Sequence, residues 1–397
     1  YMTPEWKKAF ALATRLADSL NLEMAIAGSP GWSQTGGPWV EPKDGMKKLV
    51  WREFDVTGGN LVTMILPDPY STTGDFQNVS PQADFSSQGE SKPLPQYYED
   101  IAVLAFRIPE NGASQSAQRP KVTSSGGRFT YDMLTDGDLG TTQLLPMGKD
   151  GKSAWIQFEY PKPHTVKSLQ IAGGGTRETY RALPPAKTRN LEVSDDGKSF
   201  TKVMDIPLGG APLQTVSFPE ITARFFRINI QNPPQPFSEF AELLGSMMSR
   251  PSGTQISELN RFSTTRINHA EEKAGFAATF DVENYATPEA GNDAIAIGEV
   301  IDLTNKMKED GSLTWEAPEG NWKIMRFGYS LTGKQNHPAS SEATGLEVDK
   351  LDARAVKDYF VNYLEQYKNA TGGLMGAKGL QYLVTDSYEA GQMTWTP

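Results

Sequence analysis

The sequence predicts an α/β fold combined with an all-β part. Near each end of the chain, an amphipathic helix leads directly into a short apolar strand, which is typical of α/β proteins. Between them, residues 120–262 contain short alternating strands with turn signals about every ten residues, as in a β-sandwich. We therefore predict an incomplete (β/α) barrel of the TIM type, interrupted by a β-sandwich and by extra β elements.

The first helix is predicted over residues 4–19. Thr3 suits the N-cap position, and Pro4 and Glu5 suit the first turn. Apolar residues then recur at helical spacing and predict one buried stripe: Trp6, Phe10, Ala13, Leu16, Ala17 and Leu20. A short apolar strand over residues 22–27 follows.

A long loop after this strand, residues 28–45, is rich in Gly and Pro and contains Trp32 and Trp39. An indole ring can cover the apolar face of a sugar, so both tryptophans are candidate substrate-binding residues. The other interpretation is that they cap the barrel from outside. The position of the loop after a strand favours the functional interpretation.

The middle of the chain is predicted to be mostly β. Strand-like runs occupy residues 49–110, and a Gly/Ser/Gln linker precedes the sandwich. Residues 275–330 return to strands, predicted at 276–280, 294–301 and 322–329. The predicted domains are therefore 1–114, the first part of the barrel; 115–265, the sandwich insert; and 266–397, β elements and the continuation of the barrel.

Composition excludes several classes of function. The net charge of −10 and the lack of a basic cluster argue against a nucleic-acid partner. The sequence contains no run of eighteen apolar residues, so no membrane-spanning helix is predicted. The chain has no cysteine, and its three histidines show no metal-ligand spacing, so a zinc site is not expected. A hard cation held by oxygen ligands stays open.

Polar residues gather before the last helix, which is predicted from Asp352 to about Ala370. Asn336, His337 and Glu347 lie on a loop that could line a pyranose site or hold Ca²⁺. The alternative is a solvated loop on which Glu347 and Asp349 cap the helix. For Asp349 the capping role is favoured.

The last predicted strand, residues 379–385, ends at two carboxylates, Asp386 and Glu389. In α/β barrels, catalytic groups lie at the carboxyl ends of strands. A carboxylate held there suits a general acid or a nucleophile. Glu389 is the candidate general acid, and Asp386 could favour its protonated form if their side chains approach. An Asp three residues earlier on a turn more often accepts backbone hydrogen bonds.

Several of these stretches resemble glycoside hydrolase family 106, the α-L-rhamnosidases. They are Asp386-Ser387-Tyr388-Glu389-Ala390-Gly391 with Trp395-Thr396, Gly345-Leu346-Glu347-Val348-Asp349-Lys350-Leu351, Gly31-Trp32-Ser33, Gly36-Gly37-Pro38-Trp39-Val40 and Met46-Lys47. The resemblance implies an inverting enzyme with Glu389 as general acid and a calcium ion at the sugar site, with Glu347 as a candidate ligand. It also implies that the general base lies beyond Pro397, so we expect the isolated chain not to turn over.

The sandwich resembles the discoidin, or galactose-binding-like, jelly roll of many carbohydrate-binding modules. The resemblance rests on Thr135-Asp136-Gly137-Asp138, Ser194-Asp195-Asp196-Gly197 and Ala223-Arg224-Phe225-Phe226-Arg227-Ile228. Asp136 and Asp138 could hold a structural calcium ion, or they could form a plain turn. We favour an architectural insert over a working lectin.

Other functions stay open at this point. The chain could be a carbohydrate-binding protein without chemistry, a partly folded structural fragment, or a glycosidase for a different sugar. The family resemblance implies an oligosaccharide or polysaccharide substrate. It also implies an exported bacterial enzyme in the periplasm, at the cell surface or secreted, although no signal peptide is visible.

Overall fold

The computed structural model describes most of the chain. The described residues are 1–79, 93–109, 118–148, 152–173, 188–207, 209–231, 253–278, 282–385 and 387–397. They divide into two compact units, which are described separately. The first comprises Tyr1–Val50, Pro69–Ile101 and Phe327–Pro397, and the second comprises Trp51–Asp68 and Ala102–Arg326.

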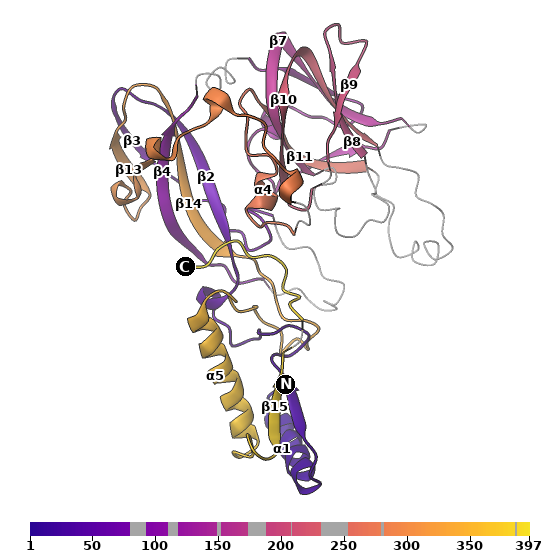
Figure 1. Ribbon diagram of the computed structural model, residues 1–397, viewed down its shortest axis with the longest axis vertical. Coiled ribbons are helices and arrows are strands. Elements are labelled where there is room, and N and C mark those ends of the chain that lie inside the picture. Colours follow the sequence, from indigo (N-terminus) through magenta and orange to yellow (C-terminus); the bar gives the residue numbers. More distant parts are fainter. Residues whose placement is uncertain are drawn as a thin grey trace. The chain divides into compact units, whose positions relative to one another are not determined.

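The first unit contains the two helix–strand pairs that the sequence predicts. Helix α1 (Pro4–Ser19) leads to β1 (Met24–Ala27), and α5 (Ala353–Ala370) leads to β15 (Leu380–Val384) (Figure 1). The two strands pair in parallel and form a two-stranded sheet. In the described part of the chain this sheet has two strands and stays open, so the predicted incomplete barrel of the TIM type is not confirmed.

Side chains cap the N-terminal ends of both helices, as predicted for Thr3. Thr3 Oγ1 accepts a hydrogen bond from Trp6 N at 3.2 Å. Asp352 Oδ1 accepts from Arg354 N at 2.9 Å and from Ala355 N at 3.1 Å. These bonds satisfy N–H groups that have no partner within the first turn of a helix.

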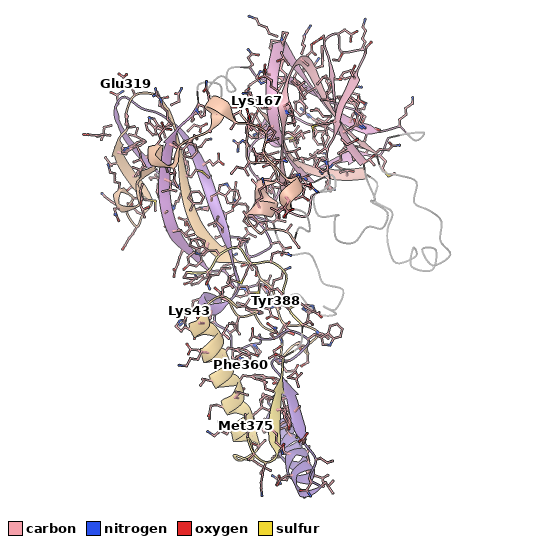
Figure 2. The ribbon with its side chains drawn as sticks, viewed as in Figure 1. Lys43, Lys167, Glu319, Phe360, Met375 and Tyr388 are labelled. Carbon is pink, nitrogen blue, oxygen red and sulfur yellow. The ribbon has the colours of Figure 1, made fainter. Side chains whose placement is uncertain are left out.

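Aromatic residues of α5 form the core of this unit. Tyr359 and Tyr363 stack with their ring centroids 5.5 Å apart, and Tyr363 Oη donates to Ala27 O of β1 at 2.9 Å. Phe360 on α5 and Met375 on the turn that follows the helix pack against the same cluster (Figure 2). The helix is thereby fixed against the strand whose following loop contributes to the site.

The predicted extra β elements pair with one another. Four strands form one sheet in the order β12-β4-β14-β2: β12 (Ile301–Asp302), β4 (Tyr98–Arg107), β14 (Asn321–Leu331) and β2 (Lys47–Thr57). A second pair consists of β3 (Leu61–Ile65) and β13 (Ser312–Glu316). Trp315 and Trp322 pack edge to face in the core of these elements, with their ring centroids 5.2 Å apart.

Two strand predictions in this region are wrong. Residues 276–278 form no strand, with a bend at 276–277, and 279–280 lie outside the described residues. In the range 294–301, a 3₁₀ turn at Ile297–Glu299 precedes β12. Ile297 is 93% exposed, so the alternating Ala and Ile residues do not face a core here.

The sandwich lies in the second unit, within the range predicted for the insert. Its strands are β5 (Lys121–Ser124), β6 (Gln143–Pro146), β7 (Ala154–Gly173), β8 (Thr188–Ser194), β9 (Thr201–Asp205), β10 (Leu213–Gln231) and β11 (Gly253–Phe262). The order is β6-β11-β7-β10-β8-β9, and β5 also pairs with β7. Inward side chains such as Phe158, Phe226 and Ile228 fill the core.

Short helical turns connect these strands. They are η1 (Pro42–Asp44), η3 (Asp132–Leu134), α4 (Ala270–Lys273), η5 (Val282–Asn284), η6 (Gly291–Asp293), η7 (Ile297–Glu299) and η8 (Thr304–Lys306). None of the helices within the described stretches is long and apolar enough to span a membrane.

Candidate active site

The loops after β1 and β15 begin side by side, because parallel neighbouring strands end at the same edge of a sheet. Gly28 N donates to Val384 O at 2.8 Å. A Cβ atom added to Gly28 would lie 3.5 Å from Thr385 Cγ2. The loop with the two tryptophans and the segment with the predicted acid therefore leave the sheet together, as the sequence predicts.

Glu389 lies on the segment after β15 and is exposed to solvent. Ser387 Oγ donates to Glu389 Oε1 at 2.8 Å. The next residue, Ala390, is buried and anchors the segment. Glu389 is thus accessible to a ligand, as a general acid must be. Asp386, the other predicted carboxylate, lies outside the described residues.

Asn336 joins the loops that were predicted to bind substrate. Its side chain is fully buried, and Nδ2 donates to Pro30 O at 2.6 Å and to Ala343 O at 3.0 Å. Its Oδ1 accepts from Gly345 N at 2.8 Å. The amide therefore holds the 28–39 loop to the 336–347 loop, and its polar atoms are engaged within the protein. Its predicted contact with substrate stays a prediction.

The same two loops meet at His337. Trp32 N donates to His337 O at 2.9 Å, and His337 Nδ1 lies 3.2 Å from Gln335 O. The imidazole is half-buried. Trp32 is 58% exposed, so its indole is available to stack on a sugar ring. The backbones of Trp32 and His337 thus lie together, and a role in binding stays a prediction for both.

Trp39 lies deeper than Trp32. Its ring centroid is 5.8 Å from that of Tyr363 and 6.4 Å from that of Tyr359, so it contributes to the aromatic core. It also lines a cavity of about 260 Å³ together with Asp44 and Arg354. The packing against tyrosines gives Trp39 a structural role, and its predicted contact with substrate stays untested.

Close approach of the two loops requires a residue without a side chain at Gly345. A Cβ atom there would lie 2.1 Å from Gly37 O and 2.5 Å from Pro38 N, which are backbone atoms. We expect Gly345→Ala to destabilise the protein by about 1–3 kcal/mol, because one loop must move. Urea denaturation checks this, with Gly298→Ala as control, since a Cβ atom at Gly298 would meet nothing within 4 Å. Equal stabilities for the two variants would contradict the clash.

Glu347 is fully buried and forms an ion pair with Lys350. Lys350 Nζ lies 2.6 Å from Glu347 Oε2, and the same ammonium donates to Thr35 Oγ1 at 3.0 Å. The other carboxylate oxygen, Glu347 Oε1, is buried without a hydrogen-bond partner. The predicted alternative of a solvated loop is therefore wrong for Glu347. Its roles in substrate or metal binding stay predictions.

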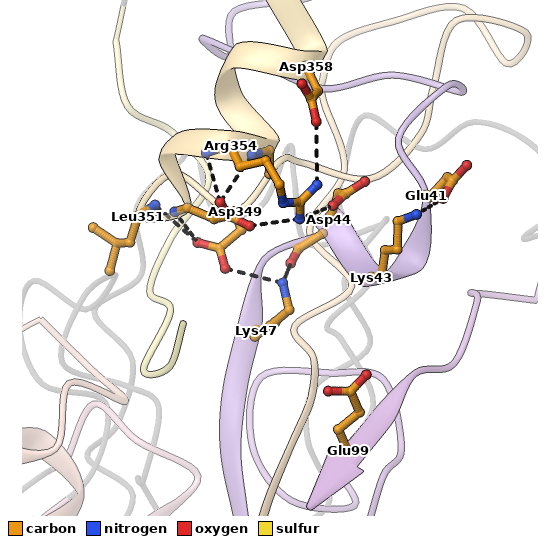
Figure 3. Close-up of polar contacts among 12 residues, drawn as sticks. Glu41, Lys43, Asp44, Lys47, Glu99, Asp349, Leu351, Arg354 and Asp358 are labelled. Carbon is orange, nitrogen blue, oxygen red and sulfur yellow. Dashed lines mark hydrogen bonds and ion pairs between the residues drawn. The ribbon is translucent and has the colours of Figure 1, made fainter. Parts of the chain in front are cut away.

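Asp349 is also fully buried, and it combines backbone hydrogen bonds with an ion pair (Figure 3). Asp349 Oδ1 accepts from Leu351 N at 3.0 Å and from Asp352 N at 3.3 Å, just before α5. Asp349 Oδ2 pairs with the buried Lys47 Nζ at 3.2 Å. The N-cap of α5 is Asp352, so the capping role expected for Asp349 is wrong. Asp349 instead holds the turn that precedes the helix.

The predicted metal-binding turn of the sandwich contains internal hydrogen bonds. Asp136 Oδ1 accepts from Asp138 N at 2.8 Å, and Asp138 Oδ2 accepts from Thr141 Oγ1 at 2.8 Å. Glu258 Oε2, on β11, accepts from Gly137 N at 3.2 Å. Burial raises the pKa of the Glu258 carboxyl to about 8; the Gly137 N–H lowers it and Asp136 raises it. Within the described ranges, no group of three or more His, Cys, Asp or Glu side chains is arranged to hold a metal ion.

Sequence reasoning assigned no role to three residues that lie here: Lys350 and Tyr388, which belong to the family-like segments, and Thr35. Lys350 Nζ lies 5.9 Å from the centroid of the Tyr388 ring, which extends from the segment before Glu389 (Figure 2). Lys350 follows Glu347 by three residues, a spacing that could have indicated an ion pair. Nothing in the sequence indicated Thr35, which comes from a loop 315 residues away.

Comparisons with known proteins show the family to which this chain belongs. A family model described as alpha-L-rhamnosidase (glycoside hydrolase family 106) matches residues 1–397. The solved structure of a rhamnosidase from Novosphingobium sp. PP1Y is similar over 100% of this chain, with 37% identity and a TM-score of 0.81. A protein of Formosa agariphila that carries a beta-glucuronidase name is 42% identical over 98 residues, 25% of this chain. This chain spans 34% of the rhamnosidase structure and 8% of the Formosa protein.

Proposed function

The chain belongs to the α-L-rhamnosidase family of glycoside hydrolases, and from this premise we propose that it is the acid-bearing part of an enzyme that removes terminal α-L-rhamnosyl residues from glycans. The observation that carries the proposal is the position of Glu389. It is an exposed carboxyl group on the segment after β15, beside the loop after β1. In this account β1 and β15 are neighbouring strands of a (β/α) barrel.

The proposed chemistry starts with Glu389 as general acid. Protonated Glu389 donates its proton to the glycosidic oxygen as the bond to the anomeric carbon breaks. Trp32, exposed on the neighbouring loop, would cover the apolar face of a bound sugar. His337 would contact its hydroxyl groups. In an inverting reaction, a second carboxylate activates a water molecule on the opposite face of the sugar.

We propose that this second carboxylate lies outside these 397 residues. The chain covers 34% of the rhamnosidase structure that it resembles, which supports a shared site with residues of the remaining length. Glu347 is unsuited as the base in this arrangement, because it is fully buried and paired with Lys350.

Calcium is part of the proposal at two places. Glu347 fits a ligand role because Oε1 is buried without a partner, and a hard cation prefers such oxygens. The turn of Asp136 and Asp138 also offers oxygen ligands. At the sugar site a cation would orient hydroxyl groups, and at the turn it would stabilise the sandwich.

Chelation tests the calcium proposal. We expect EGTA to lower the hydrolysis of an aryl α-L-rhamnoside by the full-length enzyme at least tenfold, and added Ca²⁺ to restore it. Replacing Asp136 and Asp138 together with Asn should remove the calcium dependence of the melting temperature of the sandwich while activity persists. If EGTA changes neither the activity nor the melting temperature, both proposed calcium sites are contradicted.

Substrate assays test the function itself. The full-length enzyme should hydrolyse an aryl α-L-rhamnoside faster than an aryl β-D-glucuronide, a comparison chosen because of the Formosa protein. The 397-residue chain alone should not hydrolyse the substrate, although L-rhamnose should raise its melting temperature. A carbohydrate-binding protein without chemistry would instead bind sugar through residues 120–262, unaffected by Glu389→Gln.

The family also suggests that the enzyme acts outside the cytoplasm, where glycan substrates occur.

A further inference from the structure

We propose that Lys350 is a positioning residue for the general acid: it holds the segment that carries Glu389 against the buried Glu347. This inference rests on the proposed function, because it requires Glu389 to be the acid. It goes further by assigning a role to a lysine that does not itself touch the reacting atoms. The inference rests on the contacts of Lys350 and on the exposed position of Glu389. A comparable ion pair elsewhere in the protein provides the control.

The ammonium group of Lys350 is fixed by three acceptors. Its Nζ donates to Glu347 Oε2 at 2.6 Å, to Thr35 Oγ1 at 3.0 Å and to Val348 O at 3.2 Å. An ammonium group has three N–H donors, so all of them are engaged. The Lys350 side chain is 11% exposed and that of Glu347 is fully buried, so the charge has a defined position.

Lys350 also reaches the segment that carries the acid. Its Nζ lies 5.9 Å from the centroid of the Tyr388 ring, within the range of a cation–π contact. Tyr388 directly precedes Glu389 in the sequence. The pKa of the Tyr388 hydroxyl is raised by burial and by the charges of Glu347 and Asp349, so the cluster acts on this side chain electrostatically.

The Glu389 side chain is less restricted in position than efficient proton donation requires. Its side chain is exposed, and its hydrogen bond with Ser387 lies within the same short segment. Proton donation depends on close placement, and an error of about 1 Å can lower a rate about 100-fold. A residue that fixes Tyr388 therefore restricts the carboxyl group next to it. Loss of this restriction should lower kcat more than it raises KM, because binding of the sugar ring does not depend on it.

The alternative is that the ion pair only stabilises the fold. A matched pair between β7 and η6 separates the two roles: Lys167 Nζ lies 2.9 Å from Asp293 Oδ2, and the side chains are 19% and 0% exposed. The Lys350–Glu347 pair is similar, at 2.6 Å with 11% and 0% exposed. Lys167→Met thus reproduces the loss of a buried partner without touching the acid segment.

The experiment compares these lysines in the full-length enzyme with an aryl α-L-rhamnoside. We expect Lys350→Met to lower kcat about 10- to 100-fold with KM changed less than about threefold, as for a displaced acid. Lys350→Arg should keep most of kcat, because it retains the charge and can reach Glu347. Lys167→Met should lower the melting temperature and leave kcat unchanged. Unchanged kcat in folded Lys350→Met, or equal losses in the Met and Arg variants, would overturn the inference.

A second variant keeps the test decisive if Lys350→Met does not fold. Tyr388 is 49% exposed, so Tyr388→Leu leaves no buried charge without a partner. We expect it to lower kcat about tenfold at constant KM, since it removes the link between Lys350 and the acid segment. A wild-type kcat in this variant would overturn the inference. If the unmodified enzyme does not hydrolyse the α-L-rhamnoside, the proposed function has failed instead, and the two failures are distinguished.

Discussion

Glu389→Gln should lower kcat of the full-length enzyme on an unactivated α-L-rhamnoside about 100- to 10,000-fold, the usual contribution of a general acid. Glutamine has nearly the same size, but it carries no proton that it can give to the leaving oxygen. Glu389 is exposed and bonded to Ser387, so the substitution should leave the fold intact. Steady-state kinetics, together with an unchanged melting temperature, checks this expectation.

A control for this variant comes from a glutamate on α5. Glu365 is 52% exposed and pairs with Lys368 at 3.1 Å, so Glu365→Gln makes the same chemical change on the surface of the same unit. It should leave kcat and KM unchanged. Comparable activities of the Glu389 and Glu365 variants would remove Glu389 from the mechanism.

The second large effect is expected at the ion pair between Lys47 and Asp349, whose side chains are 1% and 0% exposed. Asp349→Ala leaves the Lys47 ammonium buried without its partner, and it removes the acceptor for Leu351 N and Asp352 N. We expect a loss of about 3–5 kcal/mol in the free energy of unfolding, as is typical of a broken buried pair. Urea denaturation of the 397-residue chain measures it.

Two further variants show whether burial causes this loss. Glu365→Ala breaks an exposed pair and should cost less than about 1 kcal/mol. The double variant Lys47→Met with Asp349→Asn removes both charges, and the introduced amide oxygen can still accept a backbone hydrogen bond, so it should recover part of the lost stability. A change below about 1 kcal/mol in Asp349→Ala would contradict the importance of the pair.

The parts of the fold that could be predicted depend on neighbouring residues. Thr3 and Asp352 cap helices because their side chains bond to N–H groups two or three residues on. The strand before Glu389 was also recognisable, because its apolar run and flanking glycines are local features. By contrast, the alternation around Ile297 predicted a strand that does not form, because the pattern does not reveal whether a sheet partner exists.

The site could be predicted only in part, for the same reason. Glu389, Trp32 and His337 were proposed from the residue types on loops that follow or adjoin strands, and the structure brings these loops together. Their roles stay predictions. The sequence could not show that the Asn336 amide donates its hydrogen bonds to Pro30 O and Ala343 O, since such bonds depend on how distant loops meet.

The most direct test of the account measures how Glu389→Gln responds to the leaving group. The ratio kcat/KM would be compared between the variant and the unmodified enzyme, for α-L-rhamnosides with a dinitrophenyl group and with an alkyl alcohol as leaving groups. A dinitrophenolate leaves without protonation, whereas an alkoxide needs the proton of the acid. The account predicts a small loss for the activated substrate and a large loss for the alkyl rhamnoside. Equal losses for the two substrates would contradict the assignment of Glu389 as the general acid.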